Sequence, residues 1–134
     1  MRHNSELRIA GFTMMEVMVS VVIAGILGSI AIPQYVKLTE LSYRRQAQDI
    51  LRTIYYGERA FQVANNTYTI PAAWTTINME NPNLGPVTFA VTAAAATTFT
   101  ATATRNGGLC NGSILQIDQT RAITGGAPSW LACP

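Results

Sequence analysis

The feature that most constrains this chain is an apolar run from Phe12 to Ile32 that contains one acidic residue, Glu16, and is followed by Pro33. As an α-helix the run would span about 31 Å at roughly 1.5 Å per residue, which matches the hydrocarbon core of a bilayer. An unpaired carboxylate is costly in hydrocarbon, so the sequence predicts that Glu16 has a function.

The segment before this run does not resemble a secretory signal peptide. Residues 1–11 carry Arg2 and Arg8 and have no apolar core, whereas a signal peptide has its apolar region before the cleavage point. Cleavage after Gly11 would leave the apolar run on the mature chain. The arginines predict a cytoplasmic leader, with the rest of the chain facing outward. The alternative is an uncut membrane anchor in which Gly11 is an ordinary glycine.

The order Gly11-Phe12, Glu16 and Pro33 resembles the type IV pilin family and the related pseudopilins of type II secretion. That family has Gly before the cleavage point, Phe as the first mature residue, Glu at the fifth mature position and commonly Pro at the twenty-second. The resemblance implies cleavage between Gly11 and Phe12 by a prepilin peptidase, and N-methylation of Phe12. It divides the chain into a leader (1–11), a membrane or filament-core helix (12–33) and a headgroup (34–134).

Three roles are open for Glu16. The resemblance implies that its carboxylate neutralises the N-terminal amine of a neighbouring subunit and helps to set axial register during assembly. It could instead be recognised during processing and methylation, or lie near the membrane interface without a partner. Because Pro33 lacks a backbone donor, we expect the helix to be weakest from Gly25 to Pro33 and interrupted there. The alternatives are local loss of helical order on filament packing, as in the family, or a simple kink.

From Gln34 to about Gln62 the pattern is amphipathic, which predicts one long helix from Phe12 to about Val63. Apolar residues recur at helical spacing at Tyr43, Ala47, Ile50, Leu51, Ile54 and Phe61. Glu40 and Arg44 are spaced for an ion pair within the helix. The remaining arginines predict a solvated or subunit-facing surface, in preference to a binding site for an acidic partner or a phosphate backbone. The tyrosines Tyr43, Tyr55 and Tyr56 are predicted to pack rather than to stack on bases.

After Pro86 the period changes to two, which predicts strands at 87–93, 98–104 and 114–123. A connecting loop over 67–83 is expected to be held on the core by Trp74 and Ile77. The fold class is therefore α+β, with a long N-terminal helix packed on a small antiparallel sheet. The other face of the sheet, rich in threonine, would meet solvent or a neighbour.

Cys110 and Cys133 are the two cysteines, and outside the cytoplasm they are predicted to form a disulfide worth on the order of 3 kcal/mol. The pair also resembles the disulfide-bounded C-terminal region of many type IV pilins. Unpaired thiols or a metal pair are the alternatives, although His3, in the leader, is the single histidine and cannot complete a zinc site.

Catalysis is not expected, because the mature chain lacks histidine, a phosphate-binding loop, a serine nucleophile motif and paired headgroup carboxylates. No metal or cofactor is expected either. Major pseudopilins often bind calcium in a C-terminal loop, but residues 119–134 hold no carboxylate side chain. Removing the leader lowers the formal net charge from +2 to +1, which gives no support for general nucleic-acid binding.

These observations predict a structural subunit of a type IV pilus, first in the bacterial inner membrane and then in an extracellular filament. The resemblance implies as partners other pilins, a prepilin peptidase and an inner-membrane assembly platform, and as roles adhesion, motility or DNA uptake. The alternatives are a pseudopilin of type II secretion, or a minor pilin that binds DNA or a surface through Arg105 and Arg121.

Overall fold

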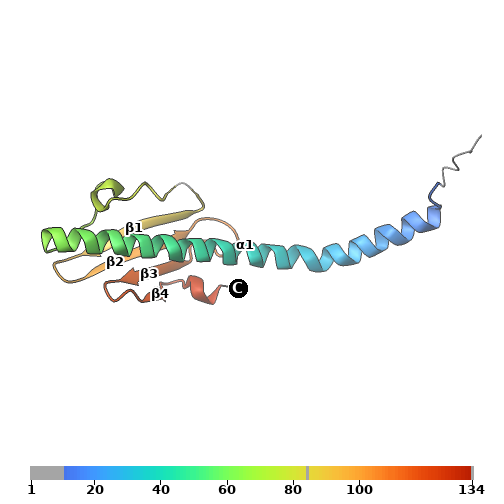
Figure 1. Ribbon diagram of the computed structural model, residues 1–134. Coiled ribbons are helices and arrows are strands. Elements are labelled where there is room, and N and C mark those ends of the chain that lie inside the picture. The colour runs from blue at the N-terminus through green and yellow to red at the C-terminus, as the bar shows by residue number, and fades with distance from the viewer. Residues whose placement is uncertain (1–10, 84, 134) are drawn as a thin grey trace, which may run out of the picture. The chain divides into compact units, whose positions relative to one another are not determined.

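The computed structural model describes residues 11–83 and 85–133, so the predicted leader over 1–10 lies outside the described residues. The chain forms two compact units, the first ending at Tyr35 and the second beginning at Val36 (Figure 1). One helix, α1 (Met14–Asn65), contributes to both, and each unit is described by itself.

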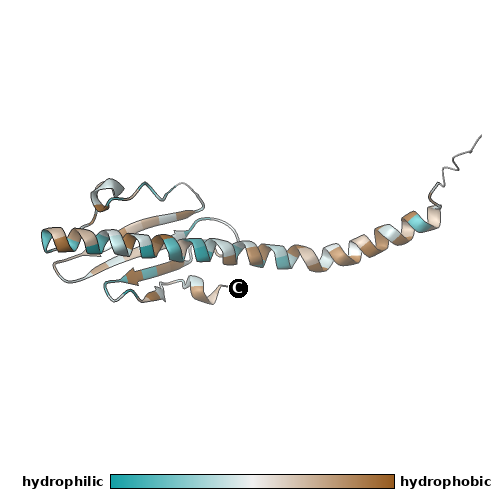
Figure 2. Cartoon of the chain, viewed as in Figure 1, coloured by the Kyte–Doolittle hydropathy of each residue, from teal (hydrophilic) through white to brown (hydrophobic). Residues whose placement is uncertain are grey.

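The first unit is an exposed apolar helix. The start of α1 is capped by Thr13, whose Oγ1 accepts a hydrogen bond from the backbone N–H of Glu16 at 3.2 Å. An 18-residue window of α1 has a mean hydropathy of 2.2 and contains no buried residue, so the helix is long and apolar enough to cross a membrane (Figure 2). The predicted interruption at Pro33 is wrong, since α1 runs through it. Pro33 removes one backbone donor, and the turns on either side keep theirs.

The second unit is a four-stranded antiparallel sheet, ordered β1-β2-β3-β4, with α1 lying across one face (Figure 1). The strands are β1 (Val87–Ala94), β2 (Phe99–Arg105), β3 (Ile114–Asp118) and β4 (Ile123–Gly125). The predicted α+β class, with one long N-terminal helix and a small antiparallel sheet, is therefore confirmed.

The third predicted strand, 114–123, is in fact two strands joined by a tight turn. Asp118 Oδ1 accepts a hydrogen bond from the Thr120 N–H at 2.8 Å, and the Arg121 N–H donates to the Asp118 carbonyl at 3.0 Å. Arg121 has a φ of 67°, in the left-handed region, which reverses the chain into β4.

Alternation along β1 and β2 places the predicted apolar residues toward α1, with one exception. Val87, Phe89 and Val91 are buried, but Ala93 is exposed because a bulge shifts the register between Val91 and Ala93. At Phe89, the side chain of Asn83 hydrogen-bonds to the backbone at the free edge of β1. Asn83 Oδ1 accepts from the Phe89 N–H at 2.5 Å, and Asn83 Nδ2 donates to the Phe89 carbonyl at 3.2 Å.

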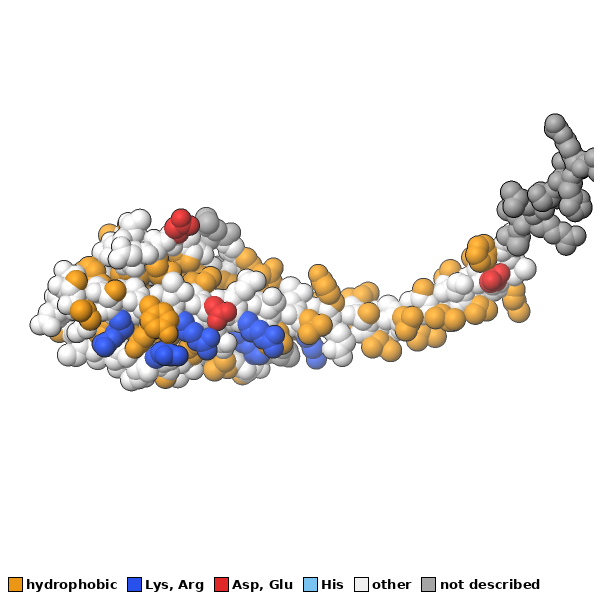
Figure 3. All heavy atoms as spheres, in the orientation of Figure 1, with side chains coloured by type: hydrophobic (Ala, Val, Ile, Leu, Met, Phe, Trp, Pro, Cys, Tyr) orange, Lys and Arg blue, Asp and Glu red, His pale blue; other side chains and the backbone are white. Residues whose placement is uncertain are grey.

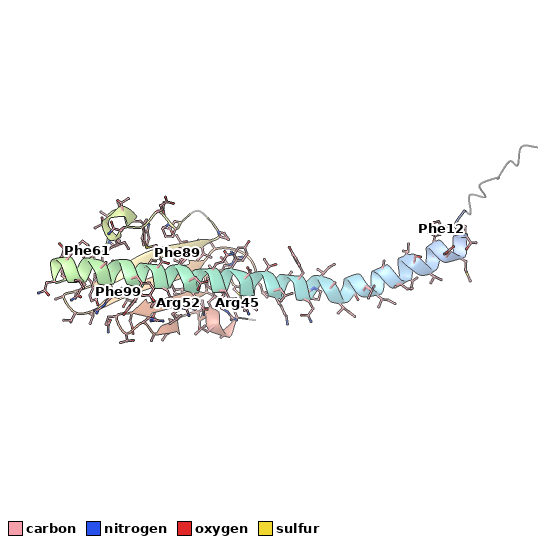
Figure 4. The ribbon with its side chains drawn as sticks, in the orientation of Figure 1. Phe12, Arg45, Arg52, Phe61, Phe89 and Phe99 are labelled. Carbon is pink, nitrogen blue, oxygen red and sulfur yellow. A yellow bond between two sulfur atoms is a disulfide. The ribbon has the colours of Figure 1, made fainter. Side chains whose placement is uncertain are left out.

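The core of the headgroup lies between α1 and the sheet. The predicted helical stripe is confirmed, with Ala47, Leu51 and Ile54 fully buried and Tyr43, Ile50 and Phe61 packed around them. Phe89 and Phe99 come from the sheet, and Phe61 from α1 (Figure 4). The short helix η1 (Trp74–Ile77) approaches α1 closely, since a Cβ added to Gly57 would lie 2.6 Å from the Ile77 carbonyl oxygen.

Candidate functional site

The first candidate site is the start of α1, where Glu16 lies on an otherwise uncharged surface. Phe12 is 80% exposed, and Glu16 is exposed as well. No other charged residue occurs between Phe12 and Val36. Among residues 11–83 and 85–133, no ion pair to the Glu16 carboxylate is found. An acidic side chain in the first helical turn is favoured by the helix dipole, and it remains available to a cation from another molecule.

Sequence reasoning missed one local role for this segment. Thr13 and Glu16 have the Thr-x-x-Glu spacing of a capping box, and the Thr13 side chain makes its half of that arrangement. The Thr-x-x-Glu spacing is the sequence signal by which this cap could have been predicted. Helix initiation therefore explains part of what this segment does, but it does not use the Glu16 carboxylate.

The second candidate region is a buried ion pair that joins α1 to the end of β2. Arg105 donates from Nε and Nη2 to the two carboxylate oxygens of Glu40, each at 2.9 Å. Their side chains are 6% and 4% exposed. Arg105 Nη1 also donates to the carbonyls of Pro86 and Asn106, and the guanidinium lies 4.4 Å from the centre of the Tyr43 ring.

This arrangement corrects two predictions. Glu40 pairs with Arg105 and not with Arg44, because Arg105 ends β2 on the face that packs against the helix. For the same reason Arg105 is buried and is not a surface contact for DNA. Arg121, the second predicted contact, is exposed in the turn before β4.

Arg44 instead holds the C-terminal segment. Its Nη1 donates to the carbonyls of Trp130 at 3.4 Å, Leu131 at 3.5 Å and Cys133 at 3.3 Å. The predicted pairing of Cys110 with Cys133 is confirmed, with Cα atoms 6.0 Å apart. Two independent links therefore fix the end of the chain to the headgroup.

A buried acid lies near the far end of α1. Glu58 is fully buried, with Oε2 accepting from the Thr69 N–H at 3.1 Å and Oε1 unpaired among the described atoms. Burial raises the pKa of Glu58, and the hydrogen bond from Thr69 opposes this rise. Glu58 follows Ile54 by four residues and Leu51 by seven, so its place on the apolar stripe was readable from the sequence.

A small groove lies on the headgroup, and its wall offers no ligands for a metal ion. The groove, of about 110 Å³, lies between α1 and the loop before β1 and has no acidic, cysteine or histidine side chain in its wall. Over the described part of the chain, no three His, Cys, Asp or Glu side chains gather as metal ligands would.

Comparisons with known proteins agree with this geometry. Residues 7–32 match the prokaryotic N-terminal methylation motif, a stretch that includes Gly11, Phe12 and Glu16. The chain is similar to the type IV major pilin protein PilA of Myxococcus xanthus (strain DK1622), at 36% identity over 59 residues. That match covers 44% of this chain and 27% of the relative, so the chain spans about a quarter of the relative's length.

The fold and the N-terminal motif define a pilin-like chain with an apolar N-terminal helix. The predicted resemblance to the type IV pilin family is therefore confirmed, by the methylation motif and the PilA similarity in sequence and by the α+β arrangement in structure.

Proposed function

We propose that this chain is the structural, non-catalytic subunit of a type IV pilus, assembled through the N-terminal part of α1. The observation that carries the proposal is a wholly exposed apolar helix with one exposed carboxylate, Glu16, in its first turn, inside a matched N-terminal methylation motif. Such a continuous apolar surface is unfavourable in water, so it needs lipid or neighbouring subunits around it.

Processing would supply the missing charge partner. In the proposal a prepilin peptidase cuts between Gly11 and Phe12, which removes 1–11 and creates an amine on Phe12 that is then methylated. Glu16 of one subunit pairs with the Phe12 amine of another, so that each charge is neutralised as both enter the apolar filament core. Before assembly, 12–33 would span the inner membrane beside the assembly platform, with the headgroup over 34–134 outside the cytoplasm.

Adhesion, motility or DNA uptake are the roles proposed for the resulting filament. A pseudopilin of type II secretion is the second candidate. The C-terminal region supports the first, because it is closed by the Cys110–Cys133 disulfide and residues 119–134 offer no carboxylate side chain to calcium.

The deciding experiment is intact mass spectrometry of filaments sheared from native cells, with variants Glu16→Gln and, as control, Ser20→Ala. Ser20 is exposed on the same stretch of helix, and its hydroxyl donates to the Glu16 carbonyl. We expect a chain that begins at Phe12, carries one added methyl group and has lost two hydrogens through the disulfide. We also expect Glu16→Gln to be processed in the envelope but largely absent from sheared filaments, while Ser20→Ala assembles normally.

Three results would contradict the proposal. A chain that retains 1–11 is an uncut anchor. If the processed chain is found only in the envelope and deleting its gene prevents export of a substrate, the chain is a pseudopilin. Normal filament yield from Glu16→Gln removes the proposed role of the carboxylate.

A further inference from the structure

Two exposed leucines lie at the end of the headgroup where α1 enters it. Leu109 is 55% exposed in the loop between β2 and β3, and Leu131 is 46% exposed in the short helix η2 (Trp130–Ala132). The disulfide between Cys110 and Cys133 ties these two segments together. Figure 1 shows the loop after β2 and the C-terminal segment at this same end of the headgroup.

Two contacts place these leucines beside the first turns of α1 in the headgroup. A Cβ added to Gly108 would lie 2.1 Å from the Glu40 carboxylate oxygen Oε1, so the loop that carries Leu109 lies against Glu40. Arg44 Nη1 donates to the Leu131 carbonyl at 3.5 Å, which places η2 against Arg44. Glu40 and Arg44 lie about one and two helical turns after the start of this unit.

The first residues of α1 in this unit add an apolar side chain and a cation. Val36 is 41% exposed and precedes Glu40 by four residues, so it lies on the side of the helix that meets the Leu109 loop. Lys37 is exposed and precedes Arg44 by seven residues, so it lies on the side that meets η2. We define the headgroup rim as Val36, Lys37, Leu109 and Leu131.

Lys37 is available to an anion outside the chain. The described residues show no ion pair to its ammonium group, and Glu40, three residues further on, is paired with Arg105. The next carboxylate along α1 is that of Asp49, about 18 Å from Lys37 along the helix. In the view of Figure 3, this end of the headgroup shows basic and apolar side chains but no acidic one. The headgroup rim therefore favours a partner that is apolar and carries negative charge at its surface.

A phospholipid surface matches these properties better than a second copy of the chain does. The rim directly follows the predicted membrane span, since Val36 is three residues after Pro33. A lysine in this place can lay its stem along the apolar interface while its ammonium group meets lipid phosphates. An ordinary protein interface uses about 20–30 residues a side, far more than the rim offers. A headgroup already tethered to a membrane needs few contacts, because the tether has removed most of the entropy cost of association.

We propose that, in the unassembled subunit, the headgroup rim docks on the extracytoplasmic surface of the membrane. Leu109, Leu131 and Val36 enter the interfacial region, and Lys37 contacts the phosphates of anionic phospholipids. Docking restricts the orientation of the headgroup and is released when the chain leaves the bilayer for a filament. This inference rests on the proposed function in one respect, that residues 12–33 span a membrane.

The test is photocrosslinking of the unassembled full chain in vesicles of phosphatidylethanolamine and phosphatidylglycerol. The apolar photoreactive residue p-benzoylphenylalanine replaces Leu109 or Leu131 at the rim. In the control chains it replaces Val63 or Ile70, which are exposed apolar residues in and after the last turns of α1. We expect lipid adducts, identified by mass, to be at least about tenfold more abundant from the rim positions, because burial of two half-exposed leucines favours docking by about that factor.

Lys37→Gln tests the ionic contact. With the probe at Leu131, we expect about fivefold fewer lipid adducts in vesicles that contain phosphatidylglycerol and no change in vesicles of phosphatidylcholine alone. The matched control is Arg121→Gln, which removes the same charge from an exposed turn before β4 and should leave the adduct yield unchanged. Equal yields from Lys37→Gln and Arg121→Gln would overturn the assignment to anionic lipid.

A probe at Ile23, inside the apolar run, separates failure of the docking from failure of the membrane span. If Ile23 gives no lipid adduct, the membrane span and the docking are both refuted. If Ile23 gives the adduct but the rim positions give no more than the control positions, only the docking is refuted. Adducts from the rim to a second copy of the chain, in place of lipid, would also refute it and would assign the rim to a subunit interface.

Discussion

Neutralising Glu40 should be among the most damaging single changes in the headgroup. Glu40→Gln keeps the size of the side chain but leaves Arg105, whose side chain is 6% exposed, with its guanidinium beside two carbonyls and the Tyr43 ring. Breaking a buried pair from one side costs about 3–5 kcal/mol, because the remaining charge is uncompensated. Against a typical domain stability of about 5–15 kcal/mol, this is a large fraction.

Replacing both partners should lower the free energy of unfolding by less than the sum of the two single changes. In Glu40→Leu/Arg105→Met no charge is left buried, although the Pro86 and Asn106 carbonyls lose their donor. We therefore expect a coupling free energy of about 2 kcal/mol or more in a double-mutant cycle. The surface pair Arg52–Asp49 provides the control, and Asp49→Asn should cost less than about 1 kcal/mol.

The assay is urea unfolding of the full chain in neutral detergent, followed by tryptophan fluorescence. Both tryptophans, Trp74 and Trp130, belong to the headgroup core, so the signal reports this unit. If Glu40→Gln shifts the free energy of unfolding no more than Asp49→Asn does, the reasoning about burial is refuted.

Three further predictions use the same assay or light scattering. Burial raises the folded-state pKa of Glu58, so the stability that its protonation supplies is present below the unfolded-state pKa and is lost as pH rises through the folded-state pKa. Glu58→Gln should flatten this pH dependence of the free energy of unfolding. Parallel pH profiles for the variant and the unchanged chain would contradict the prediction. Gly57→Ala should lower the free energy of unfolding by about 1–3 kcal/mol, because its Cβ would meet a backbone oxygen of η1 at 2.6 Å. Gly85→Ala, with nothing within 4 Å of the added Cβ, should be nearly neutral. Asn83→Ala removes both hydrogen bonds to Phe89 and frees the β1 edge, so light scattering should show faster aggregation; an unchanged rate would mean that the edge is protected otherwise.

Periodicity in the sequence predicted the main elements well. The spacing of Ala47, Leu51 and Ile54 located the buried face of α1, and alternation from Val87 and from Phe99 located β1 and β2. These signals are local, because each depends on the geometry of one helix or one strand. The disulfide was predictable because only two cysteines are present.

What the sequence did not reveal depends on contacts between distant residues or on turn geometry. The local i,i+4 rule favoured Arg44 for Glu40, but Arg105 wins because it brings two hydrogen bonds inside the core. The β1 bulge exposes Ala93, and the left-handed turn at Arg121 divides the last strand; neither has a periodic signature. The pairing of Glu16 and the cut after Gly11 remain predictions, since both involve molecules other than this chain alone.

The link from Arg44 to the chain end has a consequence for the timing of folding. Glu40 and Arg105 are 65 residues apart, and Arg44 is 86 to 89 residues from the carbonyls it holds. At about 5–20 residues per second, a ribosome needs roughly 4 to 18 s to add the 86 to 89 residues that follow Arg44. During that interval the headgroup part of α1 is already synthesised, while its apolar stripe and Glu40 still lack their partners. The headgroup can therefore complete its fold only after Trp130 to Cys133 have been synthesised, and nascent chains stalled before Trp130 should remain open to protease.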